Sequence, residues 1–208
     1  MLAIIGILAV LAIPNFVRFQ ARSKQAEPKL NLKGLYTAER AYQSEYGTYT
    51  TCIREIGFTP ERGNRYQYVV NTTDRVDDPC PRTEVRDTAA GTTHIDDGRV
   101  FADEWRYGAD AVATDATLPV VFYTAFAPSG TTVVIQNDLI GVTPNTASPA
   151  GSFGAAAQGN VDWDGNLDLW YISSVATQAV GICPVLVGGD QNAPNGEPKN
   201  IYNDVNCP

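Results

Sequence analysis

Residue types that build catalytic and metal sites are scarce in this sequence. Its 208 residues include one histidine and four widely separated cysteines, with no Cys-x-x-Cys pair. Zinc sites need closely spaced thiolates or imidazoles, so the sequence offers no zinc motif. It also contains no nucleophile elbow, phosphate-binding loop or metalloprotease motif. We therefore expect a protein that is not an enzyme.

Positive charge is almost absent from the second half of the chain. Residues 1–106 carry 14 basic and 14 acidic side chains, whereas residues 107–208 carry nine acidic side chains and only Lys199. Binding of phosphate backbones needs clustered lysine and arginine, so nucleic acid is not expected as the primary ligand. An acidic half suits a surface that stays in water.

The first 17 residues contain no charged side chain. As a helix they would span roughly 25 Å, slightly less than the ~30 Å hydrocarbon core of a bilayer. Apolar residues cover every face, which disfavours a core helix, and a signal peptide would need a basic start and a cleavage pattern. We interpret residues 1–29 as a helix that is stored in a membrane and later packs against copies of itself. A signal sequence or simple anchor, and a buried core helix, are the alternatives.

The contacts between copies are assigned to small and apolar positions of this segment. They are Ala3, Ile4, Gly6, Leu8, Ala9, Leu11, Ala12, Pro14 and Phe16. Small residues let helices approach closely. Gly6 and Pro14 weaken a helix, so we expect a kink or a melted stretch between them, and Pro28 is a second candidate kink.

Residues 30–46 have the periodicity of an amphipathic helix. Its apolar stripe contains Leu32, Leu35, Tyr42 and Tyr46. Three- and four-residue spacing places these side chains on one face, which we expect to pack on a sheet. Glu39 is expected to face outward, and Gly47 is a natural C-cap.

After Gly47 the pattern becomes that of short strands. Apolar or alternating runs occupy residues 66–70, 118–123, 131–135 and 169–172. Residues 71–99 are polar and residues 144–159 are rich in Ala, Gly and Ser, so both are interpreted as loops. The prediction is an α+β fold in which a long, kinked N-terminal helix packs on an antiparallel sheet, with residues 30–208 forming a globular head.

The four cysteines are Cys52, Cys80, Cys183 and Cys207. An even number in an exported chain favours disulfides, although four cysteines permit three connectivities. Sequential pairing is favoured because each pair then brackets a segment rich in loop residues. Each bridge would contribute roughly 2–4 kcal/mol. Reduced thiols in a cytoplasmic protein are the alternative.

One segment has the spacing of a metal site. Its oxygen-bearing side chains are Asp162, Asp164, Asn166 and Asp168. Oxygen ligands at alternate positions suit Ca²⁺, but the EF-hand pattern is not met. The alternative is a turn in which these side chains cap backbone amides. Calcium is thus a hypothesis, and no other cofactor is expected.

Several segments carry a resemblance to a known family. The N-terminal ones are AIIGILA at residues 3–9, AIPNF at 12–16 and FQARSK at 19–24. They resemble the N-terminal helix of type IVa pilins. Further matches at residues 55–66, 159–170 and 202–207 are similar to the large-headed major pilins of myxobacterial type.

The resemblance implies the structural subunit of a type IV pilus, serving adhesion and twitching motility. Such subunits wait in the inner membrane until assembly machinery polymerises them into an extracellular homopolymer. The family also implies a leader cut by a prepilin peptidase, an N-methylated first residue and an early glutamate, which we expect upstream of Met1. The alternatives are a pseudopilin of a type II secretion system and a membrane-anchored monomeric binding module or adhesin.

Overall fold

The computed structural model describes residues 15–70, 95–96, 98–107, 140–145, 148–161, 167–178 and 192–202. Its helices and strands there are α2 (Ala26–Tyr46), α3 (Glu104–Tyr107), β1 (Gln67–Val69), β2 (Ile95–Asp96), β3 (Arg99–Val100), β4 (Gly141–Asn145), β5 (Ser148–Gly159), β6 (Asp168–Ser173), β7 (Thr177–Gln178), β8 (Asn192–Ala193) and β9 (Lys199–Tyr202). Residues 15–24 are helical as well. The assembly residues predicted between Ala3 and Pro14 lie outside the described residues.

The long helix is interrupted once and ends at a glycine. Residues 15–24 and α2 are separated by a turn at Gln25. Pro28 has no N–H to donate to the carbonyl of Lys24, which explains why the interruption lies one turn before the proline. At the other end, Gly47 adopts φ 78° and donates its N–H to the carbonyl of Gln43 at 2.9 Å. The predicted C-cap is confirmed.

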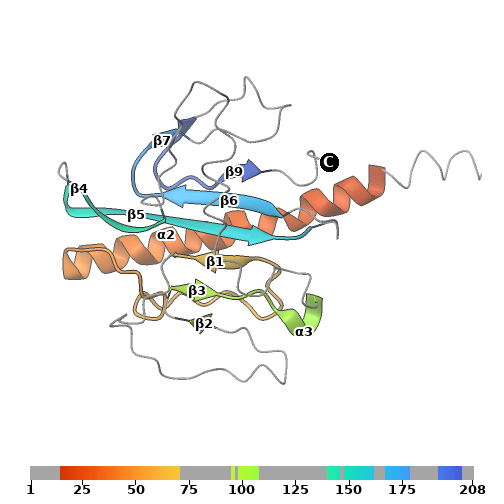
Figure 1. Ribbon diagram of the computed structural model, residues 1–208, viewed down its shortest axis with the longest axis horizontal. Helices are drawn as coiled ribbons and strands as arrows, with labels where there is room; N and C mark the ends of the chain where they lie inside the picture. The colour runs from red at the N-terminus through yellow and green to blue at the C-terminus, as the bar shows by residue number, and fades with distance from the viewer. Residues whose placement is uncertain are drawn as a thin grey trace, which may run out of the picture.

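A seven-stranded sheet covers this helix, with the strand order β2-β3-β1-β5-β6-β9 and with β4 also pairing with β5. The strand pairings in this sheet are antiparallel, which agrees with the predicted α+β fold. One edge of β5 pairs first with β4 and then with β1, while its other edge pairs with β6. Figure 1 shows the helix running along the sheet, with its first turns extending past the strands.

The longest strand lies where a loop was predicted, so that prediction was wrong. β5 has 12 residues and is rich in Ala, Gly and Ser. Such residues have low intrinsic strand propensity, but propensity is overridden where a small side chain is needed for packing. Ala155 and Ala157 are fully buried in the same core as Leu32 and Leu35. A small-residue strand therefore lets the helix approach the sheet closely.

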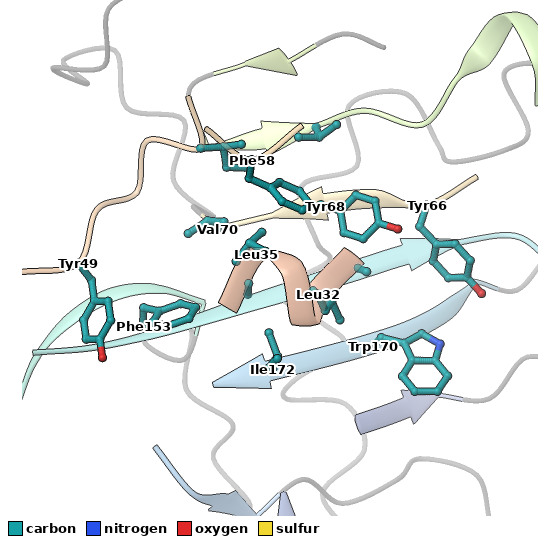
Figure 2. Packing of buried hydrophobic residues seen from close by; sticks show 14 of the residues in the cluster. Leu32, Leu35, Tyr49, Phe58, Tyr66, Tyr68, Val70, Phe153, Trp170 and Ile172 are labelled. Atoms are coloured by element: carbon teal, nitrogen blue, oxygen red, sulfur yellow. The ribbon is translucent and has the colours of Figure 1, made fainter. Parts of the chain in front are cut away.

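The core lies between α2 and the sheet. In Figure 2, Leu32 and Leu35 of the helix lie between the side chains of Tyr68 and Val70 on one side and Ile172 on the other. These residues come from the helix, the β1 region and β6, so the core joins parts of the chain that are distant in sequence.

The other strand predictions had mixed outcomes. The predicted strands at 66–70 and 169–172 correspond to β1 and β6. The predicted loop at 71–99 was partly wrong, because it contains β2 and reaches the start of β3. Residues 118–123 and 131–135 lie outside the described residues.

Candidate assembly interface

Residues that face the sheet recur every three or four positions along the helix. The buried positions are Ala21, Gln25, Pro28, Leu32, Leu35 and Glu39. This spacing keeps all of them on one side of an α-helix. Burial thus begins before residue 30, at Ala21.

The C-terminal end of the predicted stripe needs correction. Tyr42 is partly buried, but Tyr46 is 61% exposed. The two rings stack on each other with centroids 4.4 Å apart, and the Tyr42 hydroxyl donates to Glu55 at 3.1 Å. Tyr46 has the right phase for the stripe, but it lies beyond the side chains that form the core.

Glu39 was predicted to face outward, and that was wrong. Its side chain is fully buried, and its Oε2 accepts a 3.4 Å hydrogen bond from the backbone N–H of Thr50. Position 39 follows Leu35 by four residues, so the helical period places it under the sheet whatever its polarity. Charge alone was a poor guide to its orientation.

A buried carboxylate joins the helix to three parts of the sheet. Asp168, at the start of β6, accepts hydrogen bonds from the side chains of Gln25 at 3.0 Å, Tyr66 at 2.7 Å and Asn200 at 2.9 Å, and from the indole N–H of Trp170. We call these five residues the Asp168 cluster. Burial raises the pKa of Asp168, and the four donors oppose that effect. The cluster fixes the register of the helix against the sheet, since polar partners tolerate less displacement than apolar ones.

A second carboxylate holds the start of β1. Glu27 Oε1 accepts hydrogen bonds from the backbone N–H groups of Arg65 at 2.8 Å and Tyr66 at 3.2 Å. The Tyr68 hydroxyl donates to the same oxygen at 3.3 Å and accepts from Asn31 at 2.8 Å. Burial raises the pKa of Glu27 and, together with the negative charge of Glu27, that of Tyr68.

Two lysines of the helix bind loop carbonyls. The ammonium group of Lys24 donates to the carbonyl of Val161 at 2.6 Å, and that of Lys33 donates to the carbonyl of Gly196 at 2.6 Å. Gly196 has φ 70°, and a Cβ atom there would lie 2.6 Å from the ring of Tyr36. The turn between β8 and β9 therefore packs directly on α2.

The opposite face of the helix exposes large apolar side chains. Phe16 is 61%, Phe19 70% and Leu30 73% exposed, and Val17 is 50% exposed. Every residue from 15 to 20 is exposed, because the sheet begins to cover the helix at Ala21. Phe16, Phe19 and Leu30 in addition share the side that faces away from the sheet, because their spacing is close to whole turns of the helix. We call these three residues the outward stripe. Buried apolar area stabilises proteins, so such a stripe on one side of an ordered helix marks a surface for another protein or a membrane.

The remaining predicted site residues are described only in part. Cys52 is buried and disulfide-bonded. The other three cysteines lie outside the described residues, so the sequential pairing stays a prediction. Asp162, Asp164 and Asn166 also lie outside them, and the calcium hypothesis stays untested. If Asp168 bound calcium, its carboxylate would have to lose the hydrogen bonds from the donors of the Asp168 cluster.

Within the described ranges, the protein has neither a membrane-spanning helix nor a metal-binding cluster. In those ranges no helix is long and apolar enough to cross a bilayer. The same ranges contain no group of three or more His, Cys, Asp or Glu side chains that could hold a metal ion.

The sequence of the chain also matches known proteins. A family model described as "Type IV pilin PilA" matches residues 19–168 of the chain. The protein therefore belongs to the type IV pilin family. The chain is also 42% identical to the protein named "Type IV major pilin protein PilA" of Myxococcus xanthus (strain DK1622), over 99% of this chain and 88% of that one.

Sequence reasoning missed the polar residues that hold the helix to the sheet. Gln25 and Glu27 were not considered as site residues, and Asp168 was considered only as a calcium ligand. The position of Gln25 in the helix could have indicated its burial, because it precedes Leu32 by seven residues and therefore shares its face. The partners of these side chains come from distant strands, which periodicity does not reveal.

Proposed function

We propose that this protein is the structural subunit of a type IV pilus, polymerised with identical copies through its N-terminal helix. The observation that carries the proposal is the outward stripe, which leaves large apolar side chains uncovered on a helix that the protein's own sheet covers only from Ala21 onward and only on the other face. Membership of the type IV pilin family supports the same conclusion.

A fibre needs neighbouring copies to contact each other through two different surfaces. In the proposed fibre, the outward stripe of one copy packs against a different surface of the next copy. Such head-to-tail contacts extend indefinitely unless the rotation between copies closes. Fully burying one Phe or Leu side chain contributes about 1.5–3 kcal/mol, so the outward stripe adds to what the apolar residues 1–14 provide.

Before assembly, the subunit is held in the inner membrane by the apolar residues 1–17, and assembly machinery transfers it to the fibre. A prepilin peptidase removes a leader upstream. The finished fibre lies outside the cell and serves surface adhesion and twitching motility. The protein acts as a building block and not as an enzyme. The lack of charge in residues 1–17 and their match to the family helix support the membrane-held stage.

Electron microscopy of fibres sheared from cells that express the full chain tests the proposal. Wild-type cells are expected to yield long fibres. Phe19→Glu places a charge on the outward stripe and is expected to abolish them, while Ser44→Glu, at an exposed position of α2, should leave fibres intact. Circular dichroism of both variants checks that the head still folds. Monomeric particles from the wild type, or fibres of normal length from Phe19→Glu, would contradict the proposal.

A further inference from the structure

Within the described residues, the carboxyl group of Glu39 is isolated from water by the fold and incompletely paired. Glu39 is fully buried beneath the connection that follows α2. Its Oε1 atom is buried and has no hydrogen-bond partner within the described residues. Its Oε2 atom has a long 3.4 Å contact with the N–H of Thr50. A buried carboxylate normally needs several donors or a cation, as the Asp168 cluster illustrates.

Glu55, a charged group that acts on Glu39, has the wrong sign for pairing. Thr50 lies between two carboxyl groups, because its hydroxyl donates to Glu55 at 2.9 Å while its N–H points to Glu39. Tyr42, one turn along α2, also donates to Glu55 at 3.1 Å. Glu55 is the charged residue whose field acts on Glu39, and it opposes ionisation.

Within the described residues, the cation that follows Glu39 in the sequence has its hydrogen bond elsewhere. Arg40, the next residue on α2, is exposed and donates to the hydroxyl of Tyr49 at 2.8 Å. The ring of Tyr49 packs on Phe153 of β5 with centroids 4.9 Å apart, so the sheet contributes an uncharged side chain here. Burial and Glu55 together raise the pKa of Glu39 from the ordinary 4.5 to about 8.

We propose that the neutral, protonated form of Glu39 holds the connection from Gly47 to Cys52 on the head, and that loss of this proton releases the connection. Ionisation of Glu39 would place a negative charge in an apolar layer, close to the negative charge of Glu55. The free energy of the ionised carboxylate is lowered most easily if the segment that carries Thr50 moves away and water reaches residue 39. Gly47, in the left-handed conformation, and the disulfide-bonded Cys52 delimit the part that moves. The proposal concerns how the head responds to pH and does not depend on the pilus function.

The sign of the pH dependence follows from where the proton is bound. Between about pH 4.5 and 8 the closed head keeps the proton of Glu39, while an opened connection releases it. The closed state therefore holds more protons than the open one, and its stability decreases as the pH rises. The full stabilisation is present below about 4.5, and no further loss is expected above about 8.

Hydrogen exchange of the full-length protein in detergent micelles tests the proposal. Protection of the Thr50 amide, corrected for the intrinsic exchange rate, is expected to fall about tenfold per pH unit well below pH 8, and about fiftyfold between about pH 6 and about pH 8. Glu39→Gln should make this protection independent of pH. Glu45→Gln, at an exposed glutamate of the same helix, is the matched control and should behave as wild type.

A second measurement keeps the proposal testable if Glu39→Gln fails to fold. The carboxyl ¹³C shift of Glu39 in the wild type should titrate with a midpoint near 8, and in Glu55→Gln the midpoint should fall. A Glu39 midpoint near 4.5 in the wild type would overturn the proposal. So would Thr50 protection that is constant over this range, or a pH dependence that persists in Glu39→Gln.

Discussion

The two faces of the long helix differ in the kind of partner they have. The inward face places Leu32 and Leu35 in the core. Its polar side chains also form hydrogen bonds with the sheet and with the connection that follows α2. The outward stripe consists of large apolar side chains that are 61–73% exposed. The inward face thus binds its partner through complementary shape and hydrogen bonds, whereas the outward face offers a partner only apolar area.

This difference separates two tasks within one helix. Hydrogen bonds to buried groups fix a unique position, because an error of about 1 Å leaves a donor or acceptor unpaired at a cost of roughly 1–3 kcal/mol. Apolar contacts tolerate small shifts at much lower cost. The helix can therefore be held rigidly on its own head while it adapts to the neighbours in a fibre. Four substitutions test this separation, ordered by their expected effect on the stability of the head.

The largest effect is expected from Asp168→Ala. Removing the carboxylate takes this acceptor away from three buried donors and from the partly buried Asn200 of the Asp168 cluster. The loss in the free energy of unfolding should be roughly 3–5 kcal/mol, measured by chemical denaturation of the full chain in detergent. Gln25→Ala removes one of the four donors and should cost only about 1 kcal/mol. Equal losses for the two variants would show that the cluster does not act through its carboxylate.

Leu35→Ala should come next. Leu35 is fully buried against the sheet, and a Leu→Ala change in a core costs about 2–5 kcal/mol. The matched control is Leu30→Ala on the outward stripe, where the same change should cost under about 0.5 kcal/mol. The measurement is the midpoint of denaturation of both variants. Similar midpoints would mean that the two faces do not differ as described.

A smaller loss is expected from Gly196→Ala. The new Cβ atom would lie 2.6 Å from the ring of Tyr36, and φ is 70° there. Gly47→Ala is a matched control, since φ is 78° but nothing lies within 4 Å of the added atom. Both changes carry the conformational cost of about 1 kcal/mol. Gly196→Ala should cost about 1 kcal/mol more, through displacement of the turn from α2. A smaller loss for Gly196→Ala than for Gly47→Ala would show that this turn does not pack tightly on the helix.

The smallest effect on the head is expected from Leu30→Gln. The side chain is 73% exposed, so the free energy of unfolding should change by less than about 0.5 kcal/mol. Fibre yield by electron microscopy should nevertheless fall, because the polar amide weakens the outward stripe. Thr37→Gln, at another exposed position of α2, is the control for a general effect of the longer side chain. Normal fibre yield from Leu30→Gln would restrict the assembly surface to residues nearer the N-terminus.

Some elements of the fold could be predicted from the sequence and others could not. The helix, its C-cap and the strands β1 and β6 could be predicted, because periodicity and turn residues act locally. β5 could not be predicted, because its small residues Ala155 and Ala157 are explained only by packing against a helix more than a hundred residues away in the sequence. The orientation of Glu39 was missed because an ionisable side chain on an amphipathic helix usually faces water. Its burial depends on the connection that carries Thr50.

The sequence by itself determined that a long amphipathic helix leads into an antiparallel head, and its N-terminal segments identified the family. These properties follow from the spacing of residues along the chain, which sets the faces of a helix before any tertiary contact forms. Only the tertiary structure decided which polar side chains of that helix are buried and what they bind. Asp168 meets Gln25 across 143 positions of sequence, and the partners that make a buried charge tolerable are assembled only by the complete fold.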